Sequence, residues 1–292
     1  MRESDWFSWP SIIASRAALP PIFHDAVPDD KPFPYAVHLQ SQPWAGQSKN
    51  PKLVCLYPDR IVILERTNAG AIAGAAYPFE AIHRIVHGRN LLHSWLELHG
   101  VVAGKPAIST VVYNTVVDYM FDPIIVGARN FPVGPGSPAN DPSLARREFD
   151  FLRQVNFKLH NYAPMEVLPG ASIKQILYQP ELRARVLVVF QRTAIPNRVV
   201  ILTDKELISV SDAVRAESRA PARRTGGVVK SFVPLRGVRD AAIAPSDRPG
   251  VMQLAIALAN GEEPRLLFES RLAGEWETLR DALRQAAGAA AR

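Results

Sequence analysis

Short apolar runs occur along much of the chain, and turn residues separate them. Leu53–Leu56 and Ile61–Leu64 flank residues 57–60, where Pro58 and Asp59 favour a turn. Paired apolar runs around such a turn are typical of a β-hairpin. The pattern therefore predicts strands at both runs and a chain that is mainly β.

A second hairpin is predicted around residues 88–90, between strands at 79–87 and 92–99. Leu92, Leu96 and Leu98 share one parity, which predicts the inward face of a half-buried strand. The other face then carries His93, Trp95, Glu97 and His99. Between the two hairpins, residues 68–76 are rich in Gly and Ala and predict a loop.

The period changes to a helical one at three places. A helix is predicted from Asp122-Pro123 and another from Asp141-Pro142, since Pro suits a first helical turn. The second has an apolar stripe at Leu144, Phe151, Leu152, Val155 and Leu159. The last helix places Leu272, Trp276, Leu279 and Leu283 on one face, which predicts that Trp276 lies in the core.

The same order of anchors occurs twice along the chain. Tyr113, Phe121, Ile124 and Ala128 fall in step with Phe268, Trp276, Leu279 and Leu283. Upstream, Tyr77-Pro-Phe-Glu-Ala-Ile82 is matched by Val233-Pro-Leu-Arg-Gly-Val238. Repetition at so long a period indicates two copies of one domain, because solenoid units are about 20–50 residues long.

The second copy is predicted to contain eight strands: 172–178, 184–191, 198–203, 206–211, 228–235, 238–244, 252–259 and 265–269. The predicted divisions are a Pro- and aromatic-rich arm at 1–50, a first domain at 51–130, a linker and connecting helix at 131–165, and a second domain at 166–288. The aromatic residues of the arm either pack onto the body or present a binding site for a partner.

Short strands closed by a C-terminal amphipathic helix resemble the pleckstrin-homology-like fold, in particular its bacterial branch. Leu202-Thr-Asp-Lys-Glu-Leu-Ile208 and Val233–Val238 resemble characteristic strand openings, and the Phe268 strand with the Trp276 helix resembles the closing unit. The resemblance implies two partly open β-barrels, each closed by its own helix. It implies no particular ligand, because members of this fold bind phosphoinositides, peptides or no assigned ligand.

Composition narrows the class of protein. The net charge of +6 is mild for 292 residues, so it permits an anionic partner without requiring nucleic acid. Cys55 is the single cysteine and lies in an apolar run, which predicts a buried, inert thiol. No apolar run is long enough for a membrane span, so we expect a cytoplasmic protein, with peripheral membrane contact as an alternative.

The one basic cluster lies in a loop of the second copy. Its residues are Arg215, Arg219, Arg223, Arg224 and Lys230, with Asp212 and Glu217 as the nearby acids. Such a cluster can bind an anion or an anionic lipid surface. The alternative is a solvated loop whose charges have no ligand.

The second candidate is a histidine-rich hairpin with His83, His87, His93 and His99. Symmetry about residue 90 would place His87 opposite His93, but a zinc site needs three or four converging ligands. We therefore predict no metal and no cofactor, with a metal-dependent hydrolase as the alternative. None of the common catalytic motifs is present.

The sequence thus predicts a non-enzymatic binding or scaffold protein. Its expected partner is a protein or an anionic membrane surface, contacted through rim loops or an unpaired strand edge. A self-assembling structural module that forms a homo-oligomer is the third hypothesis.

Overall fold

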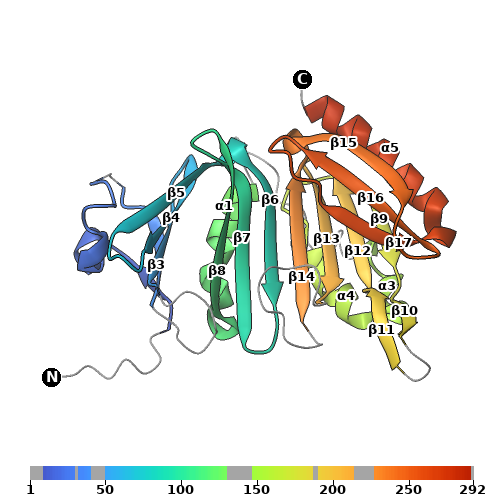
Figure 1. Ribbon diagram of the computed structural model, residues 1–292, viewed down its shortest axis with the longest axis horizontal. Helices are drawn as coiled ribbons and strands as arrows, with labels where there is room; N and C mark the ends of the chain where they lie inside the picture. Colours follow the sequence, from blue (N-terminus) through green and yellow to red (C-terminus); the bar gives the residue numbers. More distant parts are fainter. Residues whose placement is uncertain are drawn as a thin grey trace. The chain divides into compact units, whose positions relative to one another are not determined.

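The computed structural model describes residues 9–29, 32–40, 50–129, 147–186, 190–213 and 227–290. Contacts divide the chain into two compact units, Met1–Ile82 with Leu92–Phe131, and His83–Leu91 with Pro132–Arg292. The fold is mainly β, with several antiparallel sheets and a C-terminal helix (Figure 1). Among the described strands, no sheet closes into a barrel.

The first unit contains a five-stranded antiparallel sheet in the order β1-β2-β3-β4-β5. Its strands are β1 (Ser11–Ile13), β2 (Tyr35–Leu39), β3 (Lys52–Leu56), β4 (Arg60–Arg66) and β5 (Ile72–Pro78). Leu56 is paired with Ile61, which confirms the predicted hairpin at 57–60. This hairpin supplies the adjacent strands β3 and β4 of the sheet.

Two loop predictions in this unit were wrong. Residues 72–78 form β5 and not a Gly/Ala loop, because their backbone pairs with β4 from Arg66↔Ile72 to Arg60↔Pro78. Part of the predicted irregular arm is also strand, since β2 pairs along the whole of β3. Backbone pairing to an existing strand overrides weak local β-propensity in both places.

Cys55 lies on β3 of this sheet, and its side chain is fully buried in a cluster with Phe23 and Leu53. Burial raises the pKa of the Cys55 thiol to about 12. The predicted inert thiol is therefore confirmed as a buried side chain, packed among apolar neighbours.

Because the thiolate is the reactive form, we expect the native protein to react with a disulfide reagent at pH 8 at least about a hundredfold more slowly than the unfolded chain. Absorbance of the released thiol in buffer and in 6 M guanidinium measures both rates. Rapid labelling of the native protein, at a rate independent of its stability, would contradict this placement of Cys55.

The first unit also contains the hairpin of β7 (His93–Val102) and β8 (Lys105–Asn114). β7 was predicted to be half-buried, which is wrong: Trp95 and Glu97 are as buried as Leu96 and Leu98. Leu92, predicted to face inward, is exposed. A strand with both faces covered shows no alternation in burial, so its polar side chains are buried with the apolar ones.

In the described part of the second unit, two larger antiparallel sheets lie beside a separate two-stranded hairpin. The first runs in the order β6-β14-β13-β12-β9 and the second in the order β15-β16-β17. Their strands are β6 (Ile82–Arg89), β9 (Ile173–Gln179), β12 (Arg198–Thr203), β13 (Glu206–Asp212), β14 (Val228–Pro234), β15 (Val238–Pro245), β16 (Val251–Leu258) and β17 (Arg265–Glu269). The separate hairpin of β10 (Leu182–Val186) and β11 (Phe190–Ile195) replaces the single strand predicted at 184–191.

β6 makes its contacts in the second unit, although the sequence places it in the first domain. It pairs with β14 from Arg89↔Val228 to Ile85↔Phe232. This register brings Arg84 of β6 close to Ser231 of β14, and Arg84 Nε donates to Ser231 Oγ at 3.0 Å.

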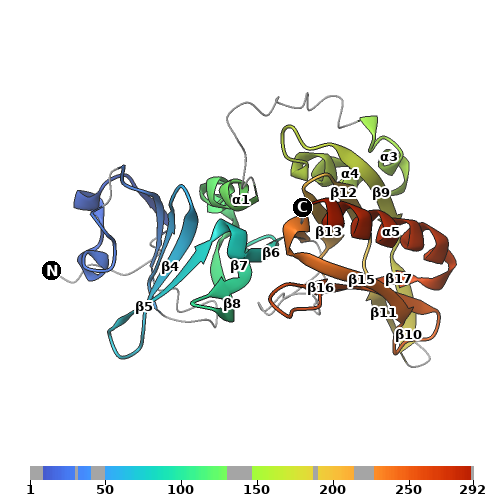
Figure 2. The same cartoon turned by 90° about the horizontal axis from the view of Figure 1, so that it is seen from above.

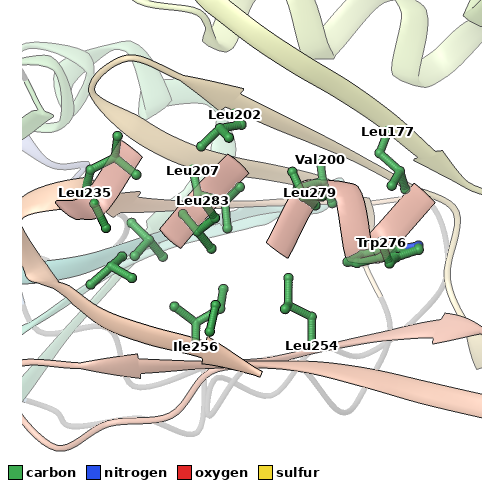
Figure 3. Close-up of a cluster of buried hydrophobic side chains, with 14 of the residues drawn as sticks. Leu177, Val200, Leu202, Leu207, Leu235, Leu254, Ile256, Trp276, Leu279 and Leu283 are labelled. Carbon is green, nitrogen blue, oxygen red and sulfur yellow. The ribbon is translucent and has the colours of Figure 1, made fainter. Parts of the chain in front are cut away.

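The C-terminal helix α5 (Ala273–Ala290) closes the second unit beside both sheets (Figure 2). Trp276, Leu279 and Leu283 are fully buried, as predicted, between Val200 and Leu207 of one sheet and Leu254 and Ile256 of the other (Figure 3). The helical spacing of these residues places them all on the one face that is covered.

The connecting helix was predicted as one continuous element. Within the described residues it is two short helices, α3 (Leu152–Val155) and α4 (Phe157–Tyr162), followed by the 3-10 turn η6 (Ala163–Glu166). Asn156, with φ of −157°, breaks the helix and caps α4 by accepting from Leu159 N at 3.0 Å. Phe151 and Val155, expected in the apolar stripe, are exposed, while Leu152 and Leu159 are buried.

The repeated anchors occupy equivalent local settings. In the first unit the ring of Tyr113 stacks on that of Phe121, with 3.8 Å between the ring centroids. Phe121 directly precedes helix α1 (Asp122–Arg129). In the second unit the ring of Phe268 stacks on that of Trp276, with 4.5 Å between the ring centroids. Trp276 lies in the first turn of α5. In each unit, therefore, one ring from the last strand is packed on one ring at the start of the closing helix.

The matched motifs at 77–82 and 233–238 also fold alike, since each contains the end of a strand followed by a 3-10 turn. Pro78 ends β5 before the 3-10 turn η4 (Phe79–Ala81), and Pro234 ends β14 before the 3-10 turn η7 (Leu235–Gly237). Phe79 and Leu235 are both buried. A proline that ends a strand cannot extend the hydrogen-bond ladder, so both strands end at the same kind of residue.

Candidate functional site

A cavity of about 210 Å³ lies in the second unit, between the larger sheet and strands β16 and β17. Its polar lining consists of three arginines and three serines: Arg84, Arg198, Arg265, Ser209, Ser211 and Ser231. The described residues that line it include no carboxylate. The sequence did not predict this site.

The cavity follows from the register of the larger sheet. Along its inward face, Leu202 is paired with Leu207, the next inward row contains Val200, Ser209 and Ser231, and Arg198 is paired with Ser211 one row further. The rows therefore change from apolar to polar along the strands. Serine is too short to reach the opposite sheet, so space remains where the leucine row gives way to serine.

Two of the arginines are held in place by hydrogen bonds. Arg84 donates to Ser231 Oγ at 3.0 Å, and Arg198 Nη1 donates to the carbonyl oxygen of Leu267 at 3.2 Å. Arg198 is only 2% exposed, which is rare for a charged side chain. These contacts fix the guanidinium groups and reduce the entropy lost when a ligand binds.

Arg265 differs because it lies at the exposed rim of the cavity. Its Nη2 contacts Glu263 Oε1 at 2.8 Å, and both side chains are about half exposed. This surface pair offsets part of the charge at the rim but leaves the two inner arginines in place.

The predicted basic cluster is placed only in part. Arg215, Arg219, Arg223 and Arg224 lie outside the described residues. Lys230 lies on β14, where its Nζ contacts Glu166 Oε1 at 2.6 Å with both side chains largely buried. Because side chains alternate along a strand, Lys230 points away from the face on which Val229 and Ser231 line the cavity.

The histidine-rich hairpin is divided between the units. His83 and His87 lie on β6 in the second unit, and His93 and His99 lie on β7 in the first. The predicted facing of His87 and His93 therefore stays a prediction. Among the described residues, no group of three or more His, Cys, Asp or Glu side chains is arranged to hold a metal ion.

Within the first unit, His99 Nε2 lies 3.1 Å from Glu97 Oε2, and both side chains are buried. In the second unit, burial lowers the pKa of His83, with Arg236 as a further cause. These contacts place both histidines in packed surroundings.

The alternation of residue types in two strands could have revealed the cavity. In Glu206–Asp212, the residues that share parity with Leu207 are Ser209 and Ser211, so the inward face turns polar halfway. Arg198 opens an otherwise apolar strand on the corresponding face. Small polar residues on an inward parity indicate either a strand end in solvent or a polar cavity.

None of the described helices has both the length and the hydropathy that a membrane-spanning segment requires. The chain matches no protein-family model and no curated protein sequence.

Proposed function

We propose that this protein is a non-enzymatic binding protein whose second unit recognises an anionic group in the cavity between its two sheets. The observation that carries this proposal is the lining, in which three arginines and three serines meet without a carboxylate among the described residues. Arginine and hydroxyl donors together bind carboxylate and phosphate oxygens through charge-assisted hydrogen bonds.

The fold supports a binding role through its resemblance to pleckstrin-homology-like domains. The second unit has a meander of β9, β12, β13 and β14, a meander of β15, β16 and β17, and then α5. This order and the stacked Phe268–Trp276 pair are what a domain of that family would have. We infer from the repeated anchors that the first unit is a second such domain.

A recessed cavity suits a single anionic group better than a flat charged surface. Arg198 is buried, so a lipid headgroup would have to leave the plane of the bilayer to reach it. We therefore favour a ligand in solution, or an acidic group carried by a protein, over an anionic membrane surface.

The proposal is tested by measuring the Tm of the full chain in phosphate and in chloride at equal ionic strength. With a dissociation constant of about 1 mM, 20 mM phosphate stabilises the second unit by about 1.8 kcal/mol. Each kcal/mol raises Tm by about 2–4 °C for a domain of this size. Arg198→Met, which keeps a side chain of similar length, should abolish the shift.

The matched control is Arg239→Met, an exposed arginine of the same unit that does not line the cavity. It should keep the full shift, whereas any general stabilisation by phosphate would appear equally in both variants. Anionic vesicles form the second arm. Vesicle binding that is lost on replacing Arg215, Arg219, Arg223 and Arg224 by Ala, but kept in Arg198→Met, would move recognition to that loop and contradict the proposal.

A further inference from the structure

The cavity has an apolar half as well as a polar one. Leu207, Val233, Ile256 and Leu266 line it beside the serines. Leu207, Val233 and Ile256 belong to the buried core cluster of the second unit, with Leu266 packed against it. The apolar half is thus continuous with the core, and the polar half lies one row along the strands.

The register fixes the order of the two halves. Leu207 is paired with Val233, and two residues further along each strand Ser209 is paired with Ser231. Inward rows two residues apart along a strand are separated by about 6.6 Å. A molecule of that length would therefore touch the hydroxyl row with one end and the apolar row with the other.

The volume limits the size of such a molecule. An apolar cavity of about 150 Å³ holds one benzene molecule. The cavity of about 210 Å³ found here has room for a ring of that size and one additional small polar group. A nucleotide or a full lipid would not fit inside it.

The arginines specify the polar group. Arg84 approaches from β6 and Arg198 from β12, so the hydroxyl row lies between two guanidinium groups from different strands. The planar fork of a guanidinium matches the two oxygens of a carboxylate. Each arginine is already held by one hydrogen bond, from Arg84 Nε to Ser231 Oγ and from Arg198 Nη1 to the carbonyl oxygen of Leu267.

From these observations we infer that the cavity binds a small amphipathic anion, namely a carboxylate attached to an apolar group about the size of a benzene ring. This inference rests on the proposed function and names the ligand class of the same site. The carboxylate would accept from Arg84, Arg198 and the serine hydroxyls, while the apolar group would contact Leu207, Ile256 and Leu266.

Isothermal titration calorimetry on the full chain tests the inference with four probes: benzoate, acetate, benzyl alcohol and inorganic phosphate. Benzoate should bind at least about tenfold more tightly than acetate, because it buries a ring of apolar surface in addition to the carboxylate. It should bind at least about tenfold more tightly than benzyl alcohol as well, since the alcohol lacks the charge.

Two variants separate the halves of the cavity. Leu266→Thr shortens a partly buried apolar lining residue and should reduce the preference for benzoate over acetate. Arg198→Met should weaken the binding of benzoate and of acetate to a similar extent. Melting curves recorded by circular dichroism establish that each variant is folded.

The outcomes distinguish this inference from the function on which it rests. Equal affinities for benzoate and acetate would overturn the amphipathic ligand and leave an anion-binding cavity. Absence of binding by benzoate, acetate and phosphate would overturn both. Tighter binding of a peptide that ends in a free phenylalanine carboxylate than of benzoate would support the proposed ligand class. It would also identify a protein C-terminus as the group that carries the carboxylate and the ring.

Discussion

Replacing Trp276 by Ala should lower the free energy of unfolding of the second unit by about 3–5 kcal/mol. The indole ring is fully buried, stacks on Phe268 at 4.5 Å and belongs to the cluster formed by α5 and both sheets. Its removal takes away both the apolar burial and the ring contact, and α5 cannot close the space without leaving the strands. Urea denaturation followed by circular dichroism measures the loss.

Two control variants separate the effect of losing the buried ring from that of any substitution in α5. Glu277→Ala, one residue along α5 and exposed, should change stability by less than about 0.5 kcal/mol. Trp276→Phe should cost much less than Ala, since it keeps an aromatic ring and removes an indole N–H that has no hydrogen-bond partner among the described residues. A cost below about 1 kcal/mol for Trp276→Ala would mean that α5 does not close the core.

The first unit contains a position comparable to Trp276. Phe121 is fully buried and stacks on Tyr113, as Trp276 stacks on Phe268. Phe121→Ala is therefore the matched variant for the first unit, at the equivalent junction of strand and helix.

Replacing Lys230 by Met should also be strongly destabilising, by about 3–5 kcal/mol. The side chains of Lys230 and Glu166 are only 15% and 10% exposed and lie 2.6 Å apart. Removing the ammonium leaves a carboxylate in a place that water barely reaches. Denaturation of the single variant at neutral pH measures this cost.

The double variant Lys230→Met with Glu166→Leu should recover most of the loss, because an apolar pair of similar volume often replaces a buried ion pair without cost. The variant also decides whether Lys230 is a ligand-binding residue. Since Lys230 faces away from the cavity, phosphate affinity should be unchanged in the folded double variant. Loss of affinity together with unchanged stability would instead place Lys230 in the binding site.

Local patterns in the sequence predicted the strands of the second unit closely. Strands at 198–203 and 265–269 have the predicted bounds, and the hairpin at 57–60 forms as expected. These elements are short apolar runs bounded by turn residues. The errors fall where tertiary pairing decides, as at β5, whose Ala and Gly residues form a strand because β4 supplies partners.

Burial was predicted less well than strand position. The half-buried strand expected at 92–99 is buried on both faces, and Phe151 and Val155 are exposed although they continue an apolar stripe. A sequence pattern gives the faces of an element but not the number of faces that are covered. That number depends on which other elements pack against it.

The amino-acid sequence by itself determined most strands of the second unit, the closing helices, the two matched ring positions and the buried thiol, because periodicity and turn chemistry act over a few neighbouring residues. Only the tertiary structure brought Arg84, Arg198 and Arg265 together around one cavity and directed Lys230 to Glu166. These residues come from strands distant in the chain, and the register between such strands is set by packing and hydrogen bonding over the whole sheet.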